Sequence, residues 1–145
     1  MSPGPPDGAI VRRHLLALDA AVQRLRRHTG RPLAALVADA DTLWAIERGL
    51  QLCAQNALDI ATHLTASAGQ DVPDYASAID RLGELGIRPD AFVGRFRGVA
   101  GFRNVLVHGY LGVDHERVHE LLNSGLDDFV AFAQYVESYL TRINA

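Results

Sequence analysis

Residues 43–64 read LWAIERGLQLCAQNALDIATHL, with apolar side chains at every third or fourth position. This spacing gives a helix one apolar stripe and predicts a long helix from a cap at Asp39 or Asp41 to about Ala66. A stripe of this length needs other helices packed against it. It consists of Leu43, Ile46, Leu50, Cys53, Ala57, Ile60 and Leu64.

The same periodicity continues on both sides of this segment, and strand signals are nearly absent. Short loops between long helices favour antiparallel neighbours. We therefore expect an all-α fold, an up-and-down bundle of about five helices. Besides the helix above, these are Ile10 to about His28, Asp74 to Leu85, Pro89-Asp90 to about His108, and Asp114 to about Ile143 with a soft break near Gly125; residues 33–38 add a short helical turn.

The 145 residues correspond to about one domain, which we place at 9–145 behind a flexible N-terminal lead at 1–8. No apolar run reaches the ~20 residues that span a bilayer, and the N-terminus lacks the features of a signal peptide. The single cysteine, Cys53, lies on the apolar stripe, where a buried and inert thiol is expected. These features favour a cytoplasmic protein without membrane contact.

The net charge is −3, whereas a general nucleic-acid coat protein is usually basic. Contact with RNA would therefore depend on a local patch. All 14 basic residues are arginines. Arg88, Arg95 and Arg97 precede the motif described below, and Arg103 is its first residue. Arginine grips phosphate through two parallel hydrogen bonds, so Arg95 and Arg97 are candidates for a patch that binds RNA phosphate.

Three glycines, Gly94, Gly98 and Gly101, lie within the fourth predicted helix. Each costs roughly 1 kcal/mol in a helix interior, so we expect something to approach this helix closely. Tight packing between helices is the first explanation. The second is a surface that another subunit or an RNA backbone can approach.

The chemistry concentrates in residues 103–110, which read RNVLVHGY. Arg103 is a permanent cation, and His108 titrates near neutral pH. A metal-free ribonuclease needs a group that holds phosphate and a group that moves protons. On an ideal helix the two residues lie about 140° apart, and Gly109 is placed to end the helix. Taken singly, Arg103, His108 and Tyr110 would fit ordinary surface, capping and packing roles.

Residues 115–119 read HERVH, which matches the HExxH zinc signature. His115 and His119 would share a helix face with Glu116 between them. The positions where the extended signature needs glycine and a third histidine hold Leu122 and Gly125, and no strands are predicted to bind a substrate peptide. We interpret this segment as a charged helix face and assign no metal, although two histidines could bind one adventitiously.

The spacing Arg103-x4-His108-x-Tyr110 resembles the RX4HXY signature of the HepT-like HEPN toxins, the ribonuclease half of HEPN/MNT type VII toxin–antitoxin pairs. The similarity extends over residues 102–114 and over the block from Trp44 to His63, and it covers about residues 10–143. It implies a HEPN-like helical bundle.

The resemblance implies that Arg103 and His108 are the catalytic pair of a metal-independent endoribonuclease that requires no cofactor. Arg103 would bind the scissile phosphate, and His108 would transfer protons while the RNA 2′-hydroxyl attacks. Asn104 would orient the substrate. The family forms homodimers in which both motifs line one cleft, which would bring together two side chains that face apart on one helix.

The resemblance also implies a partner, the MNT-type nucleotidyltransferase antitoxin, which would attach AMP to Tyr110. The added phosphate and nucleoside would compete with RNA for Arg103 and block the cleft. An alternative function is a catalytically silent HEPN bundle that serves as the binding partner of a nucleotidyltransferase.

Overall fold

The computed structural model describes residues 4–108 and 114–145, and these ranges contain helices and no strand. The predicted all-α bundle is confirmed. The helices are α1 (Gly8–Arg26), α2 (Leu33–Ala38), α3 (Ala40–Ser67), α4 (Tyr75–Glu84), α5 (Asp90–Phe96), α6 (Gly98–His108), α7 (His115–Glu120) and α8 (Leu126–Arg142), with a π-helical turn at Leu121–Gly125 between the last two.

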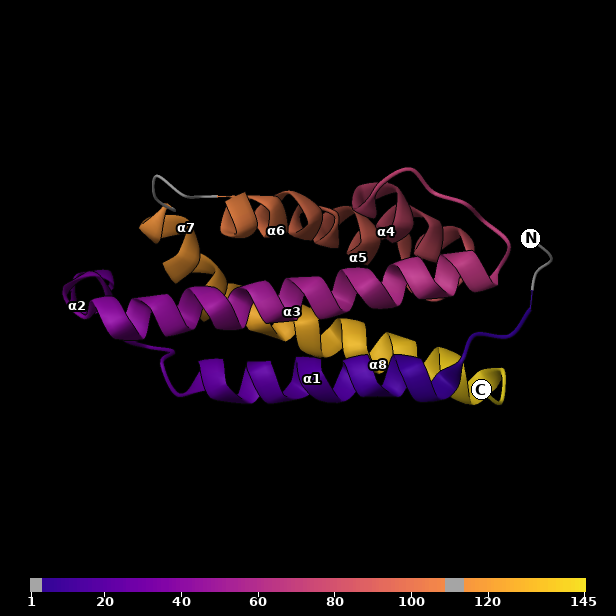
Figure 1. Ribbon diagram of the computed structural model, residues 1–145, viewed down its shortest axis with the longest axis horizontal. Coiled ribbons are helices and arrows are strands. Elements are labelled where there is room, and N and C mark those ends of the chain that lie inside the picture. The colour runs from indigo at the N-terminus through magenta and orange to yellow at the C-terminus, as the bar shows by residue number, and fades with distance from the viewer. Residues whose placement is uncertain (1–3, 109–113) are drawn as a thin grey trace.

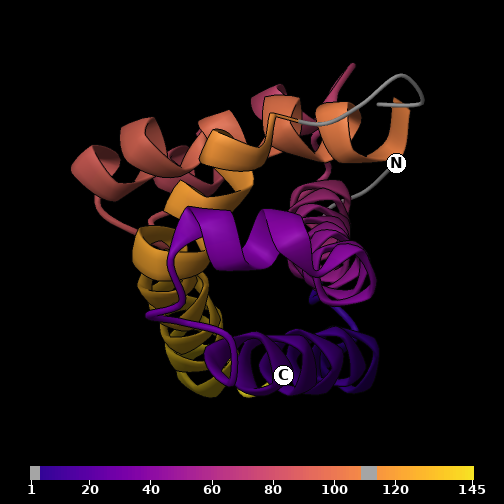
Figure 2. The same cartoon turned by 90° about the vertical axis from the view of Figure 1, so that its left-hand side faces the viewer.

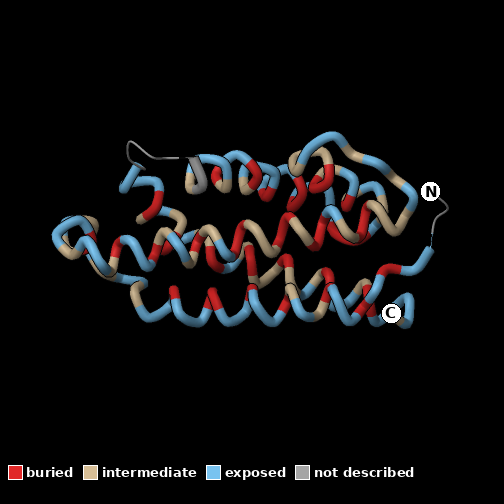
Figure 3. Tube along the Cα trace, viewed as in Figure 1, coloured by how far each residue is buried: buried red, intermediate tan, exposed pale blue. Residues whose placement is uncertain are grey.

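Helix α3 is the centre of the bundle (Figure 1). It packs against α1 on one side and against α4 and α6 on the other, while α8 lies against α1 and α3. Viewed along the bundle, α4–α6 lie over one side of the group formed by α1, α3 and α8 (Figure 2). The buried positions face this interior (Figure 3). All seven residues of the predicted α3 stripe are buried.

Aspartates cap four of the helices. Asp39, not Asp41, caps α3 by accepting a hydrogen bond from the Thr42 amide at 3.2 Å. Asp74 caps α4 through the Ser77 amide at 2.7 Å, as predicted, and Asp114 caps α7. Asp7 caps α1, so this helix begins at Gly8, two residues earlier than expected.

Part of the expected N-terminal lead lies against the bundle. The Gly4 amide donates to the Ser67 carbonyl at 2.8 Å, and the Asp7 amide donates to Nε2 of His63 at 3.1 Å. Pro6 is buried. These contacts join residues 4–7 to the C-terminal half of α3. Whether 9–145 is the domain boundary stays a prediction.

Two predicted helices are interrupted. The fourth divides at Arg97 into α5 and α6, directly before Gly98, a residue type that costs roughly 1 kcal/mol in a helix interior. The fifth is interrupted by the π-helical turn, close to the break expected at Gly125. In this turn Asn123 and Ser124 donate to carbonyls four residues earlier, at 2.8 and 2.6 Å, and such side-chain bonds disturb helix geometry.

The outermost residues of the predicted first and fifth helices are exposed. Ile10 is 39% exposed, and its neighbour Val11 is completely buried in its place. Ile143 is 37% exposed, because α8 ends one residue before it. Cys53 is buried as expected, and burial raises the pKa of its thiol to about 12.

Close packing between described helices does not explain the three glycines of the fourth predicted helix. A Cβ atom built on Gly94, Gly98 or Gly101 meets no atom of the described chain within 4 Å. A different glycine has the tight-packing role. A Cβ on Gly49 of α3 would lie 2.7 Å from Cδ2 of Leu25, so Gly49 allows α1 and α3 to approach each other.

Over the described residues, none of the helices is both long and apolar enough to cross a lipid bilayer.

Candidate functional site

Arg103 lies on α6, on the side that packs against α3, and it is partly buried. Its Nε donates a hydrogen bond of 2.7 Å to Oε1 of Gln55 on α3. Its Nη1 donates at 3.1 Å to Oδ1 of Asn104. The guanidinium carbon lies 5.5 Å from the centre of the Tyr75 ring, within the range of a cation–π contact. Three helices therefore hold one cation in place.

Gln55 is itself held by further contacts. Its Nε2 donates to Oδ1 of Asp59 at 2.8 Å and lies 3.3 Å from the Tyr75 hydroxyl. These bonds fix the orientation of the amide, so that its oxygen faces Arg103. A neutral amide holds the guanidinium without neutralising it, and the positive charge remains available to an anion.

Gln55, Asp59 and Tyr75 were not among the predicted site residues. Gln55 and Asp59 are one helical turn apart on α3, so they share a face. That spacing was the only available signal, and it did not indicate which helix would lie opposite. Gln55 is 48 residues from Arg103 in the chain.

One nitrogen of the guanidinium bonds to no described residue. Among the described residues, no hydrogen bond is made by Nη2 of Arg103, while Nε and Nη1 hold the side chain. A guanidinium fixed through two nitrogens and open at a third can receive a phosphate oxygen.

The structure leaves two predicted site residues untested. His108 is the last residue of α6, and its side chain lies outside the described part of the chain. Tyr110 falls within residues 109–113, which also lie outside it. The convergence of Arg103 with His108 and the exposure of Tyr110 therefore stay predictions.

Asn104 is exposed, and its Oδ1 accepts from Arg103. It lines a cavity of about 630 Å³ beside Arg103, together with Thr62, Tyr75 and Gly101. This partly open cavity is lined by polar and apolar side chains, and it has room for a nucleotide. Substrate orientation by Asn104 stays a prediction.

The arginines that precede the motif do not form one patch. Arg95 makes a two-pronged ion pair with Asp128, with Nη2 3.0 Å from Oδ1. Arg97 pairs with Asp80 at 3.1 Å. Arg88 is buried. Each of the two candidate phosphate-binding arginines is therefore already compensated by a carboxylate.

Comparison with known proteins places the chain in a family. The family model described as Ribonuclease HepT-like matches residues 18–136. The chain belongs to the HepT-like family. This match includes α3, Gln55 and the whole of the Arg103–Tyr110 motif.

Two curated relatives match this HepT-like chain. A protein named putative RNase from Archaeoglobus fulgidus is 34% identical over 89 residues, which are 61% of this chain and 67% of the relative. A protein named tRNA nuclease HepT from Aphanizomenon flos-aquae is 29% identical over 96 residues, 65% of each protein. The chain thus spans about two thirds of the length of these relatives.

Solved structures share the fold. The tri-AMPylated HEPN toxin of Shewanella oneidensis, determined in complex with its MNT antitoxin, superposes with a TM-score of 0.81 at 17% identity, covering 91% of this chain and 99% of that one. YutE from Bacillus subtilis, a cytosolic protein of unknown function, superposes with a TM-score of 0.80 at 16% identity, covering 93% and 91%.

The HExxH segment of this HepT-like protein is divided between two environments. His115 is exposed in the first turn of α7, whereas Nε2 of His119 lies 2.9 Å from the Arg31 carbonyl. The carbonyl can only accept, so this nitrogen carries the proton. In the described ranges, no three His, Cys, Asp or Glu side chains come close enough to hold a metal ion.

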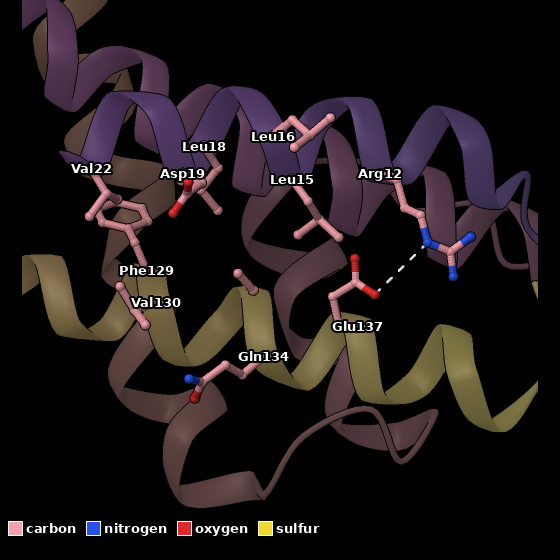
Figure 4. Close-up of a pocket in the computed structure, with 11 residues that line it drawn as sticks. Arg12, Leu15, Leu16, Leu18, Asp19, Val22, Phe129, Val130, Gln134 and Glu137 are labelled. Atoms are coloured by element: carbon pink, nitrogen blue, oxygen red, sulfur yellow. Dashed lines mark ion pairs between the residues drawn. The ribbon is translucent and has the colours of Figure 1, made fainter. Parts of the chain in front are cut away.

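A second cavity, of about 500 Å³, lies between α1 and α8 and is mainly apolar (Figure 4). Leu15, Leu16 and Phe129 line it, and Arg12 faces Glu137 at 3.9 Å across its edge. Its lining contains no histidine. The Arg103 surroundings are the candidate site, because Arg103 belongs to the predicted motif and its side chain is held there by hydrogen bonds.

Proposed function

We propose that this HepT-like protein is a metal-independent endoribonuclease and the toxin of a HEPN/MNT toxin–antitoxin pair. The observation that carries the proposal is the held guanidinium of Arg103, whose Nη2 bonds to no described residue, on a helix that ends at His108. The names of the two curated relatives support a nuclease that acts on RNA, and one of them makes tRNA the first substrate to test.

The proposed reaction uses the nucleophile that RNA supplies. His108 removes the proton from the 2′-hydroxyl, whose oxygen attacks the adjacent phosphorus while the bond to the 5′-oxygen breaks. The 5′-oxygen leaves with a proton from an imidazolium. Arg103 compensates the charge on the phosphoryl oxygens as it develops. The products end in a 2′,3′-cyclic phosphate, which a water molecule can then open to a 3′-phosphate, and in a 5′-hydroxyl.

The active form would be a homodimer. Arg103 and His108 lie about 140° apart on an ideal helix, so a second copy that brings its own motif to the same cleft would supply the missing group. The glycine face of α6 supports this arrangement, because no atom of the described chain occupies the space next to Gly98 and Gly101.

Regulation would occur at Tyr110 through AMP added by an MNT-type nucleotidyltransferase. The tri-AMPylated neighbour bound to its MNT antitoxin supports this part of the proposal. With partner and ATP, the parent protein should gain about 329 Da per AMP, a mass set by the covalent chemistry. Tyr110→Phe should gain none. Labelling that persists in this variant would place the modification elsewhere, with Tyr75, Tyr135 and Tyr139 tested next.

One observation favours the alternative, a catalytically silent bundle that binds a nucleotidyltransferase. Arg95 and Arg97 are paired with Asp128 and Asp80, which leaves little positive charge beside Arg103 for RNA. The two functions differ in what the chain does when it is expressed alone. A toxin arrests growth, and a silent bundle does not.

The growth test compares the parent with Arg103→Ala and His108→Ala, each expressed without a partner. The proposal predicts arrest by the parent and normal growth with either variant, at equal protein levels and equal helical circular dichroism. Arrest that persists in His108→Ala would refute the catalytic assignment.

A further inference from the structure

Trp44 is an exposed aromatic side chain on the central helix α3. It is the single tryptophan of the chain, and it is 75% exposed, more than any other large apolar side chain in the described ranges. No described ring or guanidinium is stacked on it, whereas guanidinium groups lie over the rings of Phe92 and Tyr75. One exposed apolar side chain is common on protein surfaces, so its meaning depends on what lies beside it.

Arg48 lies one turn after Trp44, on the same side of α3. It is exposed, and its Nη1 donates to the amide oxygen of Gln51 at 3.2 Å. A neutral amide does not compensate the charge of the guanidinium. Seven other arginines form ion pairs with carboxylates of the described chain, namely Arg12, Arg26, Arg31, Arg81, Arg95, Arg97 and Arg117. Arg48 belongs to none of these pairs.

The C-terminal end of α1 brings two more arginines next to Arg48. A cavity of about 320 Å³ lies between this end of α1 and α3, and the charged and titratable groups of its lining are Arg24, Arg27, His28 and Arg48, without a carboxylate. Arg24 and Arg27 are exposed and form no ion pair in the described chain. Basic residues at a helix C-terminus can be explained by the helix dipole, but Arg48 lies inside α3.

The side of α3 that carries Trp44 also reaches the candidate site. Trp44 and Gln55 are separated by about 20° around the helix axis and by roughly 16 Å along it. Gln55 holds Arg103 of α6. Helix α6 runs antiparallel to α3, and its C-terminal end lies toward the N-terminal half of α3 (Figure 1). The basic α1–α3 surface, which consists of Arg24, Arg27, Trp44 and Arg48, is therefore continuous with the site along α3.

The chemistry of this surface suits a single-stranded nucleic acid. Proteins bind single strands through basic groups that follow the backbone and through aromatic rings on which bases stack. The indole of Trp44 offers a stacking face, and the exposed guanidinium groups can each bind phosphate oxygens. A double helix keeps its bases stacked on one another, so it offers no base to the indole. The net charge of the chain is −3, so this local excess of positive charge stands out.

We propose that the basic α1–α3 surface binds a single-stranded segment of RNA that continues from the phosphate at Arg103. Trp44 stacks on one base, and the three arginines contact phosphates of neighbouring nucleotides. The proposal rests on the ribonuclease function proposed above for the identity of its ligand. It also locates positive charge for RNA, which is scarce beside the motif because Arg95 and Arg97 are ion-paired.

Trp44 reports on binding through its own fluorescence. The probe is a single-stranded 2′-O-methyl oligonucleotide of about ten nucleotides, which lacks the attacking hydroxyl and therefore binds without being cleaved. It should quench the fluorescence of the parent protein saturably, and the same sequence as a duplex should not. Sodium chloride should weaken binding, because phosphate contacts release counterions.

The anisotropy of a labelled oligonucleotide measures the affinity of the variants. The dissociation constant should rise about tenfold in Trp44→Ala, which removes the stacking face. It should also rise in Arg48→Gln, and the slope of its logarithm against the logarithm of salt concentration should fall by about 0.7, the value for one phosphate contact with a single strand. In cleavage assays both variants should raise KM more than they change kcat.

Leu16→Ala and Arg81→Gln are the matched controls, because Leu16 is 71% exposed on α1 and Arg81 is ion-paired with Glu84. Both should bind like the parent. Unchanged affinity in Trp44→Ala or in Arg48→Gln would overturn the proposal, even if the protein cleaves RNA. Fluorescence that changes with protein concentration and not with the oligonucleotide would also overturn it, since a second copy would then cover Trp44. Saturable quenching without cleavage of unmodified RNA would support this surface and refute only the ribonuclease function.

Discussion

Gln55 and Arg103 are joined by a hydrogen bond of 2.7 Å that connects the central helix α3 to α6. The amide accepts from Nε, the nitrogen nearest the backbone, and Nη1 donates to Asn104, so that Nη2 is the nitrogen that bonds to no described residue. Asp59 and Tyr75 fix the amide in turn. The position of Arg103 therefore depends on a residue from the opposite helix that would not itself contact the reacting atoms.

Replacing Gln55 should reduce RNA cleavage without unfolding the protein. In Gln55→Leu the guanidinium loses its anchor, and a misplacement of about 1 Å can reduce a rate on the order of a hundredfold. We expect kcat to fall about 10- to 100-fold while KM changes less. The assay is cleavage of labelled tRNA, with circular dichroism to verify the fold.

Gln51→Leu is the control for that experiment. Gln51 lies one turn before Gln55 on α3 and accepts from Arg48, not from Arg103. It should keep parental activity. Full activity in Gln55→Leu, or equal losses in both variants, would show that the bond does not position Arg103.

Gly101 and Gly49 should respond to alanine in opposite ways. A Cβ at Gly101 enters open space in the described chain, so Gly101→Ala should stabilise α6 by roughly 0.5–1 kcal/mol. A Cβ at Gly49 meets Leu25 at 2.7 Å, and overpacking of this kind costs about 1–3 kcal/mol. Urea unfolding measures both. If Gly101→Ala were less stable than the parent, this would contradict the open space found next to Gly101 in the single chain.

The cap at Asp39 should make stability depend on acid pH. Its hydrogen bonds with the Thr42 side chain and amide lower the pKa of Asp39 below the ordinary 3.8. The folded state therefore favours the carboxylate, and the stabilisation is complete well above pH 3.8 and is lost as the pH falls through the lowered pKa. Asp39→Asn should have a lower Tm than the parent at pH 7, and the difference should shrink in acid. A difference in Tm that stays constant from pH 7 down to strong acid would show that the charge of the Asp39 carboxylate is not the cause.

Helical periodicity predicted the core of this fold well, and the reason is visible in α3. All seven residues of its stripe are buried, because a helix with partners on two sides leaves little freedom in which face turns inward. At the chain ends the same pattern was less reliable. Ile10 is exposed because its neighbour Val11 takes the buried position, and Ile143 lies one residue beyond the end of α8.

The interruptions were harder to predict from the sequence. The apolar residues keep their helical spacing on both sides of Arg97, so the hydrophobic pattern does not mark the division between α5 and α6. Gly98 was a signal for it, but three glycines in one segment were interpreted as a packing surface. Near Gly125, Asn123 and Ser124 bond to the helix backbone, a local effect that the hydrophobic pattern does not contain.

The candidate site was predicted in part. The motif identified Arg103 because all its residues lie within the short segment 103–110 of the chain. Gln55 and Tyr75 depend on how α3, α4 and α6 pack, and a single sequence does not specify which polar residues meet across helices. The ion pairs of Arg95 and Arg97 were missed for the same reason, since Asp128 is 33 residues from Arg95 and Asp80 is 17 from Arg97.

The central claim is that Arg103 and His108 cleave RNA without a metal ion. The most direct measurement incubates the purified protein with tRNA in excess EDTA, beside His108→Ala, and analyses the ends of the fragments. We predict cleavage by the parent that EDTA does not reduce, fragments ending in a cyclic phosphate or a 3′-phosphate, and no cleavage by His108→Ala. Cleavage that EDTA abolishes, or that His108→Ala retains, would contradict the claim.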